Sequence, residues 1–233
     1  MTDQFDFNLP FGRCVDYDFY AGEQSVQSFQ TAKNNGVDLA ILRVGQGGVG
    51  IDKQLHNSQK ACKGILPRDY YFYLSIYESA NGQAQDCINY INGDYDNDTI
   101  LWADFEEDNH GKKNIDASFL YGFMETIKSL MPNLKLGVYS GYSFWSEWGS
   151  VDPYWSQYKL WIAHPTNPYV APTPLEPFDG WYYHQWSFAG NDKLYGAVDL
   201  NYMFNKIDPN PQPIQNVTHS LGIYDNGSLK EIK

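Results

Sequence analysis

The sequence predicts an α/β fold, a TIM-like (β/α) barrel that is irregular in its second half. Short apolar runs typical of strands recur along the chain, about eight in all. Stretches of helical character separate the first five runs, and loops separate the last three. Alternating strands and helices with short connections indicate parallel strands joined by right-handed crossovers. Eight such strands are enough to close a barrel.

The expected elements follow from local patterns. Strands are expected at 13–19, 38–44, 68–75, 100–106, 135–140, 158–163, 181–187 and 198–201, and helices at 25–34, 53–63, 82–92 and 116–130. Ser25 is a candidate N-cap of the first helix and Gly36 its stop signal. The fifth strand is followed by a loop rich in aromatic residues, from Tyr142 to Trp148. We therefore expect five βα units followed by three strands with few helices.

The composition changes near the C-terminal end of the chain. A length of 233 residues suits one full-sized domain. From Asp208 the sequence turns to Pro-Asn-Pro-Gln-Pro, which is typical of a linker. We predict a catalytic barrel over 1–207 and a Pro/Asn-rich linker or C-terminal tail over 208–233. A small hairpin is expected around Tyr224–Ser228.

Charge and apolar patterning exclude several classes of partner. The net charge is −12 and the basic residues form no cluster, which argues against nucleic acid and anionic membrane surfaces. No apolar run approaches the ~20 residues of a membrane span, and no signal-peptide pattern opens the chain. The three cysteines form no CxxC or zinc pattern, so we expect buried, reduced thiols. No obligate protein partner is predicted.

Four acids stand at the ends of predicted strands: Asp16, Asp104, Glu106 and Asp199. Side chains alternate along a strand, so Asp104 and Glu106 point the same way and Phe105 points toward the helices. Strands one, four and eight would bring all four acids to the C-terminal rim, where such barrels have their active sites. Paired carboxyl groups are the chemistry of glycoside hydrolysis. The 17% aromatic content suits either a packed core or a groove that stacks on sugar rings.

Metal and phosphate sites find little support in the sequence. A stretch starting at Asp94 begins like a calcium loop, but Thr99 replaces the required Gly and Phe105 the required Glu. The glycine-rich run Gly45–Gly50 lacks a following Lys-Ser/Thr, so it is expected to be a flexible rim loop. The five histidines show no HxxxH pairing. We expect no metal and no cofactor.

A series of short motifs adds a family resemblance. In chain order they are Cys14-Val-Asp16, Ile41-Leu-Arg43-Val-Gly45-Gln-Gly47, Asp69-Tyr-Tyr71-Phe-Tyr73, Asp104-Phe-Glu106, Gly137-Val-Tyr139-Ser140, Leu160-Trp161-Ile-Ala163, His184-Gln185-Trp186-Ser187 and Val198-Asp199-Leu-Asn201. In this order and spacing, over nearly all of 13–204, they resemble the glycoside hydrolase family 25 lysozymes, N-acetylmuramidases that include many phage endolysins. The chain departs from that family around Asp16, which lacks the usual Gly and Ser, and at Phe72 and Trp186, where the family has His and Tyr.

The resemblance implies roles for the acids. Glu106 is expected to be the general acid, since desolvation and the nearby Asp104 should raise its pKa. Asp104 is expected to stabilise charge or to orient the substrate's 2-acetamido group as nucleophile. Asp16 and Asp199 would position these groups or a water. An inverting route, in which Asp16 or Asp199 activates water, stays open.

Substrate contacts are expected from aromatic residues and one arginine. Tyr71, Tyr139, Trp161 and Trp186 are candidates for the sugar-facing wall, with core packing as the alternative for each. Arg43 lies in a strand that looks buried, so an ion pair with one of the rim acids is expected.

The resemblance implies a peptidoglycan hydrolase that cuts between N-acetylmuramic acid and N-acetylglucosamine. Two other functions remain open: a barrel that binds wall glycan without cutting it, and a chitin-type β-1,4-glycosidase. Bacterial peptidoglycan is the expected partner. An enzyme made in the cytoplasm without a signal peptide would reach the wall only after release, as a phage endolysin does at host lysis.

Overall fold

Eight strands form a closed barrel in the computed structural model of the chain, which describes residues 5–107, 115–165, 172–173, 175–187, 199–206, 222–225 and 228–231. The barrel strands are β1 (Phe5–Tyr17), β2 (Leu39–Gln46), β4 (Arg68–Tyr73), β5 (Ile100–Asp104), β6 (Lys135–Gly141), β7 (Lys159–Ala163), β8 (Tyr183–Ser187) and β9 (Asp199–Lys206). Their order around the barrel is β1-β9-β8-β7-β6-β5-β4-β2, and the pairing of β1 with β2 closes it. The predicted α/β barrel is therefore confirmed.

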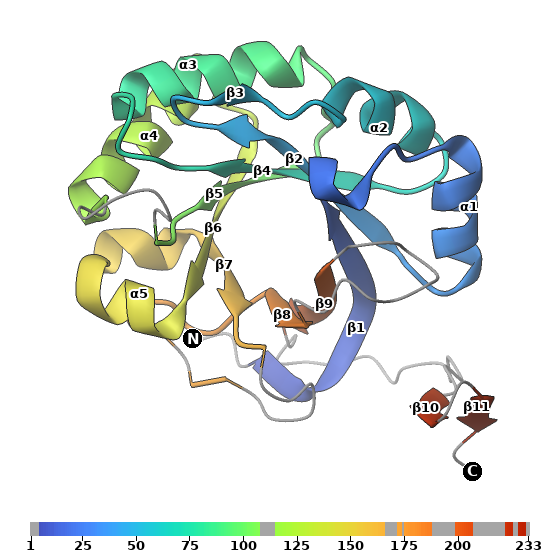
Figure 1. The fold of residues 1–233 in the computed structure, drawn as a ribbon. Helices are drawn as coiled ribbons and strands as arrows, with labels where there is room; N and C mark the ends of the chain where they lie inside the picture. The colour runs from blue at the N-terminus through green and yellow to red at the C-terminus, as the bar shows by residue number, and fades with distance from the viewer. Residues whose placement is uncertain are drawn as a thin grey trace.

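Helices cover the outside of the barrel from β1 round to β6 (Figure 1). They are α1 (Val26–Asn34), α2 (Leu55–Cys62), α3 (Ala80–Ile91), α4 (Ala117–Leu130) and α5 (Tyr142–Trp148), with two short 3-10 turns, η1 (Phe19–Ala21) and η2 (Pro153–Gln157). The capping signals act as predicted. The Ser25 hydroxyl accepts the Ser28 amide, and Gly36 ends the α1 turn at a φ of +86°.

The aromatic loop predicted after β6 is wrong, because residues 142–148 form helix α5. Neither end of this helix carries a side-chain cap, so the usual start signal is missing from the sequence. Tertiary packing stabilises the helix instead. The buried Trp145 ring packs against three other rings, and the distance between ring centroids is 5.9 Å to Phe105, 5.8 Å to Trp155 and 4.9 Å to Phe178.

The expectation of a wholly parallel barrel is wrong at its last strand. Strands β1, β2 and β4 to β8 run parallel to one another, whereas β9 is antiparallel to both β8 and β1. Residues 188–198 are fewer than the dozen or more that a parallel crossover needs. Asp199 therefore opens β9 instead of ending a strand. It still reaches the C-terminal rim, since an antiparallel strand begins where its parallel neighbours end.

Two short hairpins complete the described structure. β3 (Gly50–Ile51) folds back on the end of β2, so the glycine-rich rim segment forms a tight turn. A Cβ on Gly45 would lie 2.5 Å from the Gly50 carbonyl oxygen, so this close approach requires glycine. The predicted C-terminal hairpin is confirmed as β10 (Gly222–Asp225) paired with β11 (Ser228–Glu231). The domain boundary at 207 stays a prediction.

Two cores hold the barrel together. The larger lies between the strands and the helices, and the smaller fills the barrel interior. The interior core consists mainly of large side chains: Cys14, Ile41, Ile100, Trp102, Tyr139, Trp161, Tyr183 and Met203. Many of the aromatic residues therefore serve as core. They also form a floor beneath the C-terminal rim, so that a cavity there is shallow.

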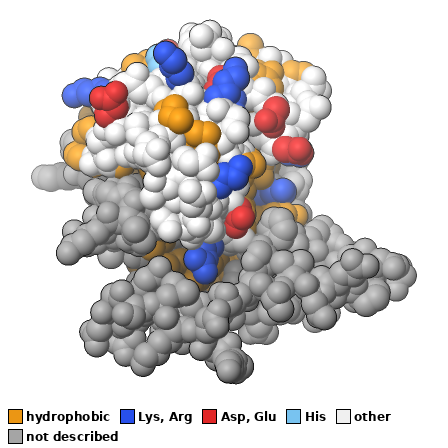
Figure 2. Space-filling view, turned by 90° about the vertical axis from the view of Figure 1, so that its right-hand side faces the viewer, with side chains coloured by type: hydrophobic (Ala, Val, Ile, Leu, Met, Phe, Trp, Pro, Cys, Tyr) orange, Lys and Arg blue, Asp and Glu red, His pale blue; other side chains and the backbone are white. Residues whose placement is uncertain are grey.

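The outer surface carries charges of both signs. On the face turned to the viewer in Figure 2, Lys and Arg side chains are scattered among Asp and Glu side chains. The described part of this face thus gathers no basic patch. None of the described helices combines the length and the apolar character needed to cross a membrane. The three cysteines are buried and unpaired, as predicted.

Phe105 provides a test of the packing behind the paired acids. Its side chain is fully buried and lies 4.9 Å from the Phe144 ring, in the layer between β5 and α5. We expect Phe105→Ala to lower the free energy of unfolding by about 3–5 kcal/mol, because the cavity it leaves cannot fully collapse. Urea denaturation followed by circular dichroism measures the change. Phe105→Leu should lose clearly less, and equal losses for the two variants would contradict the packing.

Candidate active site

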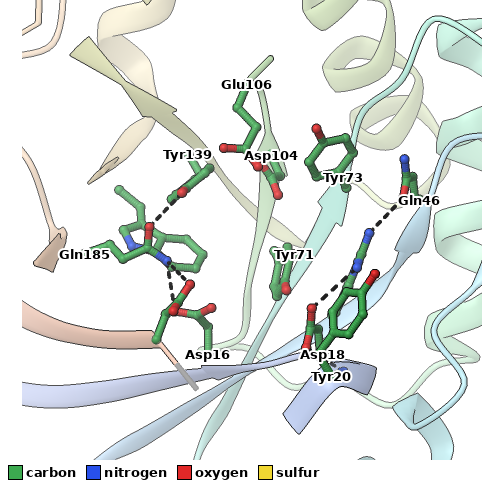
Figure 3. A pocket seen from close by; sticks show the side chains of 13 residues that line it. Asp16, Asp18, Tyr20, Gln46, Tyr71, Tyr73, Asp104, Glu106, Tyr139 and Gln185 are labelled. Carbon is green, nitrogen blue, oxygen red and sulfur yellow. Dashed lines mark hydrogen bonds and ion pairs between the residues drawn. The ribbon is translucent and has the colours of Figure 1, made fainter. Parts of the chain in front are cut away.

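A cavity of about 270 Å³ opens at the C-terminal rim of the barrel, above the aromatic interior. Figure 3 shows its side chains converging from strands on opposite sides of the barrel. The lining residues are Asp16, Asp18, Tyr20, Arg43, Gln46, Tyr71, Tyr73, Asp104, Glu106, Tyr139, Trp161, Gln185 and Asp199. All four predicted acids are among them.

The segment that carries Asp104 and Glu106 is held by the strands on both sides. The Phe105 amide donates to the Tyr139 carbonyl on β6 at 2.9 Å. The Tyr73 hydroxyl on β4 donates to the Glu107 carbonyl at 2.5 Å. Phe105 is anchored in the helix layer, so the two flanking acids face the cavity. The alternation predicted from sequence is confirmed for this segment.

Asp16 and Asp199 form a second pair of acids across the β1–β9 ladder, where they are direct partners in register. The Gln185 amide bridges them, donating to Asp16 Oδ2 at 3.3 Å and to Asp199 Oδ2 at 3.2 Å. Asn201 donates to Asp16 Oδ2 at 2.7 Å. The Tyr139 hydroxyl donates to Gln185 Oε1 at 2.7 Å, which fixes the orientation of the amide. This side of the cavity is therefore a connected hydrogen-bond network.

Burial raises the pKa of every one of these four acids. Burial, followed by the charge of Asp199, raises the pKa of Asp16 to about 8. The pKa of Asp199 rises to about 6, mainly through burial. Burial raises the pKa of Glu106 to about 7 against the opposing charge of Arg43. The pKa of Asp104 lies well above its ordinary value because of burial and then the charge of Glu106.

Arg43 is the cation among the cavity-lining residues. Its Nη1 lies 3.6 Å from Asp18 Oδ2, and its Nη2 donates to Gln46 Oε1 at 3.0 Å. The guanidinium carbon also lies 5.7 Å from the Tyr73 ring centroid. Arg43 thus pairs with a rim acid, as expected, but with Asp18 instead of one of the four predicted acids.

The structure brings all but one of the predicted site residues to the cavity. Tyr71, Tyr139 and Trp161 line it, with Trp161 packed edge-on against Tyr139 at 4.6 Å and Tyr71 at 6.1 Å. Tyr139 and Trp161 also belong to the interior core, so each packs in the core and lines the cavity, and a contact with sugar stays a prediction. Trp186 does not line the cavity. It stacks on Tyr202 at 5.6 Å, because its neighbour Gln185 takes the inward position on β8.

Five lining residues were not predicted as site residues: Asp18, Tyr20, Gln46, Tyr73 and Gln185. Period-two alternation could have found two of them, since Asp18 follows Asp16 and Tyr73 follows Tyr71 on the same faces. Gln46 escapes this rule because the β2–β4 register shifts between Arg43 and Gly45. No group of three or more metal-ligating side chains is arranged to hold an ion in the part of the chain that the structure describes.

Comparison with known proteins places this site in a family. A barrel with paired, buried carboxyl groups beside an aromatic wall has the features of a glycoside hydrolase. The model of glycosyl hydrolases family 25 matches residues 15–193, and the chain belongs to this family. It is therefore a glycoside hydrolase, and the resemblance read from its motifs is confirmed.

Individual relatives agree in sequence and in fold. A probable GH family 25 lysozyme of Dictyostelium discoideum is 27% identical over 164 residues, which cover 67% of this chain and 74% of the relative. A bacterial lysozyme from Streptomyces coelicolor superposes with a TM-score of 0.68 at 19% identity, over 82% of this chain and 91% of that one. The autolysin LytC from Streptococcus pneumoniae, solved with a synthetic peptidoglycan ligand, superposes with a TM-score of 0.64 at 22% identity, over 82% and 46% of the two chains.

The raised pKa values predict how stability depends on pH. A carboxyl whose pKa is higher in the folded state than in the unfolded chain stabilises the fold when protonated, and that stability is lost as pH rises through the folded pKa. The loss begins near the ordinary pKa values of 3.8 for Asp and 4.5 for Glu, and it is complete by about pH 6 for Asp199, pH 7 for Glu106 and pH 8 for Asp16. We expect the melting temperature to fall between pH 5 and pH 8.

Asp104→Asn tests the same argument at one position. The Asp104 side chain is 3% exposed, and its Oδ1 has no hydrogen-bond partner among the described residues. An amide there removes the cost of burying a charge. Differential scanning calorimetry should show a higher melting temperature for Asp104→Asn than for the wild type, by a larger margin at pH 8 than at pH 5. A lower melting temperature at both pH values would show that ionised Asp104 stabilises the fold.

Proposed function

We propose that this protein is a peptidoglycan hydrolase that cleaves the β-1,4 bond between N-acetylmuramic acid and N-acetylglucosamine. The observation that carries the proposal is the Asp104/Glu106 pair, in which Asp104 is buried and Glu106 partly buried, facing a cavity with an aromatic wall. The lysozyme relatives and the peptidoglycan complex of the autolysin support the choice of substrate.

Glu106 is the proton donor in this proposal. Its pKa of about 7 leaves a large protonated fraction near neutrality, which a general acid needs. Glu106 is less buried than Asp104, so its proton is the one that a substrate in the cavity can reach. Protonating the glycosidic oxygen lets the bond to the anomeric carbon break as an oxocarbenium-like centre develops.

Asp104 is assigned to the substrate's 2-acetamido group. Its buried Oδ1 accepts no hydrogen bond among the described residues, which suits an oxygen that awaits a donor from the substrate. Accepting the acetamido N–H would aim the acetamido carbonyl oxygen at the anomeric carbon. That oxygen forms the new bond while the leaving oxygen takes the Glu106 proton, and water then opens the cyclic intermediate with Glu106 as base.

Asp16 and Asp199 are assigned a positioning role. Gln185 and Asn201 already donate to their oxygens, in a network that reaches Tyr139. These bonds favour fixed carboxyl groups that shape the cavity over a base that must capture a free water. The substrate-assisted route is therefore preferred to the inverting route.

The site of action is proposed from chemistry alone. Three buried, unpaired cysteines suit a protein that folds in a reducing compartment. We propose synthesis in the cytoplasm and action on the wall after release, in the manner of an endolysin. Induced expression with and without a pore-forming partner tests this, since lysis should require the pore. Lysis without any pore would contradict it.

Glu106→Gln tests the assignment of the acid. We expect the release of reducing ends from purified cell walls to fall by about 10²–10⁴-fold, because the amide cannot donate the proton. Circular dichroism should show an unchanged fold. Glu147→Gln, an exposed position on α5, serves as the matched control and should keep full activity. If Glu106→Gln were as active as the control, Glu106 could not be the proton donor.

The digestion products test the bond. Mass spectrometry of the digested wall should find N-acetylmuramic acid at every new reducing end. New ends on N-acetylglucosamine, or faster turnover of soluble chitin oligomers than of peptidoglycan, would favour the chitin-type alternative. Binding to walls without any new reducing end would favour the non-catalytic alternative.

A further inference from the structure

Tyr20 combines two properties that the catalytic role does not explain. It lines the cavity, yet its side chain is 73% exposed. It lies in the η1 turn directly after β1, where its ring meets the Phe19 ring at 3.9 Å between centroids. One face of an aromatic pair is thus presented at the edge of the cavity.

The turn that carries Tyr20 is held in place by two carboxylates. The Tyr20 amide donates to Asp18 Oδ1 at 2.8 Å, and the Phe19 amide donates to Asp52 Oδ2 at 3.0 Å. Asp52 is buried, and its Oδ1 also accepts a hydrogen bond from the backbone N–H of Gln54 at 2.8 Å, so its position is fixed. An exposed ring on a restrained backbone is preorganised for binding, since little ordering is left for the ligand to impose.

Planar polar side chains lie beside this ring. Asp18 pairs with Arg43, and Arg43 donates to Gln46. In Figure 3, Asp18, Tyr20 and Gln46 stand on the side of the cavity opposite Gln185 and Asp16. A carboxylate, a guanidinium and an amide supply acceptors and donors in fixed planes. With an aromatic face, they match the hydroxyl edge and the apolar face of a pyranose ring.

The cavity is also too small to hold a polymer. Its volume of about 270 Å³ is below the ~300–1,000 Å³ of pockets that enclose drug-sized ligands. A glycan strand therefore has to extend over the rim. Tyr20 lines the cavity and is exposed at its edge, so it is a group that such a strand can contact.

We propose that Tyr20, with Asp18, Arg43 and Gln46, forms a subsite for a sugar ring of the glycan strand that is not one of the two joined by the cleaved bond. The proposal rests on the glycan-cleaving function proposed above. Tyr20 is a specificity-determining residue in this reading: it retains long strands and contributes nothing to the chemical step.

Substitutions at Tyr20 test the subsite. We expect Tyr20→Ala to raise KM for soluble, peptide-free peptidoglycan strands by about 3–10-fold with kcat unchanged, because one stacking contact is lost. Tyr20→Trp should keep the wild-type KM, since it restores an aromatic face. The shortest oligosaccharide that the wild type cleaves should show a much smaller effect. Tyr121→Ala on α4, which removes an exposed ring that does not line the cavity, is the matched control.

A binding measurement separates this proposal from the proposed function. The dissociation constant of the same strands is measured by calorimetry with Glu106→Gln alone and with Tyr20→Ala added. Weaker binding by the double variant than by Glu106→Gln alone supports the subsite, whether or not the wild type cleaves the strands. A wild type that cleaves no strand would overturn only the proposed function. An active wild type with unchanged KM and unchanged dissociation constant in the Tyr20→Ala variants would overturn the subsite.

Discussion

The burial of acidic side chains against one another at the barrel rim is the constraint on which the rest of the site depends. Removing a carboxylate from water is costly, and placing a second one beside it adds repulsion. The protein meets this cost by letting the groups hold protons, as the raised pKa values of Asp16 and Glu106 show. A carboxyl that holds a proton near neutrality is also what glycoside cleavage needs from its acid. The burial of these carboxyl groups thus keeps them protonated near neutrality, and it also lowers the stability of the fold at higher pH.

Asp69 shows how the same barrel treats a carboxyl that has no access to the cavity. Burial raises its pKa to about 6, but the Ile100 amide, the Trp102 indole and the Tyr183 hydroxyl all donate to it. Its oxygens are satisfied, and it ties the aromatic floor together. Asp104 lies on the neighbouring strand, and one of its buried oxygens lacks any such donor among the described residues. This contrast in hydrogen bonding makes Asp69 a structural group and supports the role proposed for Asp104 in binding the substrate.

The sequence predicts those parts of the structure that depend on local periodicity. Strand alternation places Asp104 and Glu106 in the cavity with Phe105 behind them. The apolar runs predict the strands from β2 to β8 closely, whereas β1 begins eight residues earlier and β9 ends five residues later than expected. The pattern fails where long-range packing decides. Helix α5 has no capping signal and depends on contacts of Trp145 with residues distant in the chain.

The direction of a strand is another property that periodicity does not record. A strand has the same alternation whichever way it runs, so the antiparallel β9 could not be recognised from its pattern. Alternation also leaves open which face of β8 points inward. The interior position belongs to Gln185, whose amide can bridge Asp16 and Asp199, and Trp186 takes the outer face. A hydrogen-bond donor for both Asp16 and Asp199 is therefore supplied by the inward face of β8, and only the closed barrel brings these residues together.

The ion pair between Asp18 and Arg43 acts electrostatically on both pairs of acids. The Asp18 carboxylate holds the Tyr20 turn through one oxygen and lies near Arg43 with the other. The charge of Arg43 lowers the pKa values of Asp104 and Glu106, whereas the charge of Asp18 raises that of Asp199. The ion pair thus acts in opposite directions on the two pairs of acids. Burial outweighs the charge of Arg43 at Glu106, so this proposed general acid keeps a pKa of about 7.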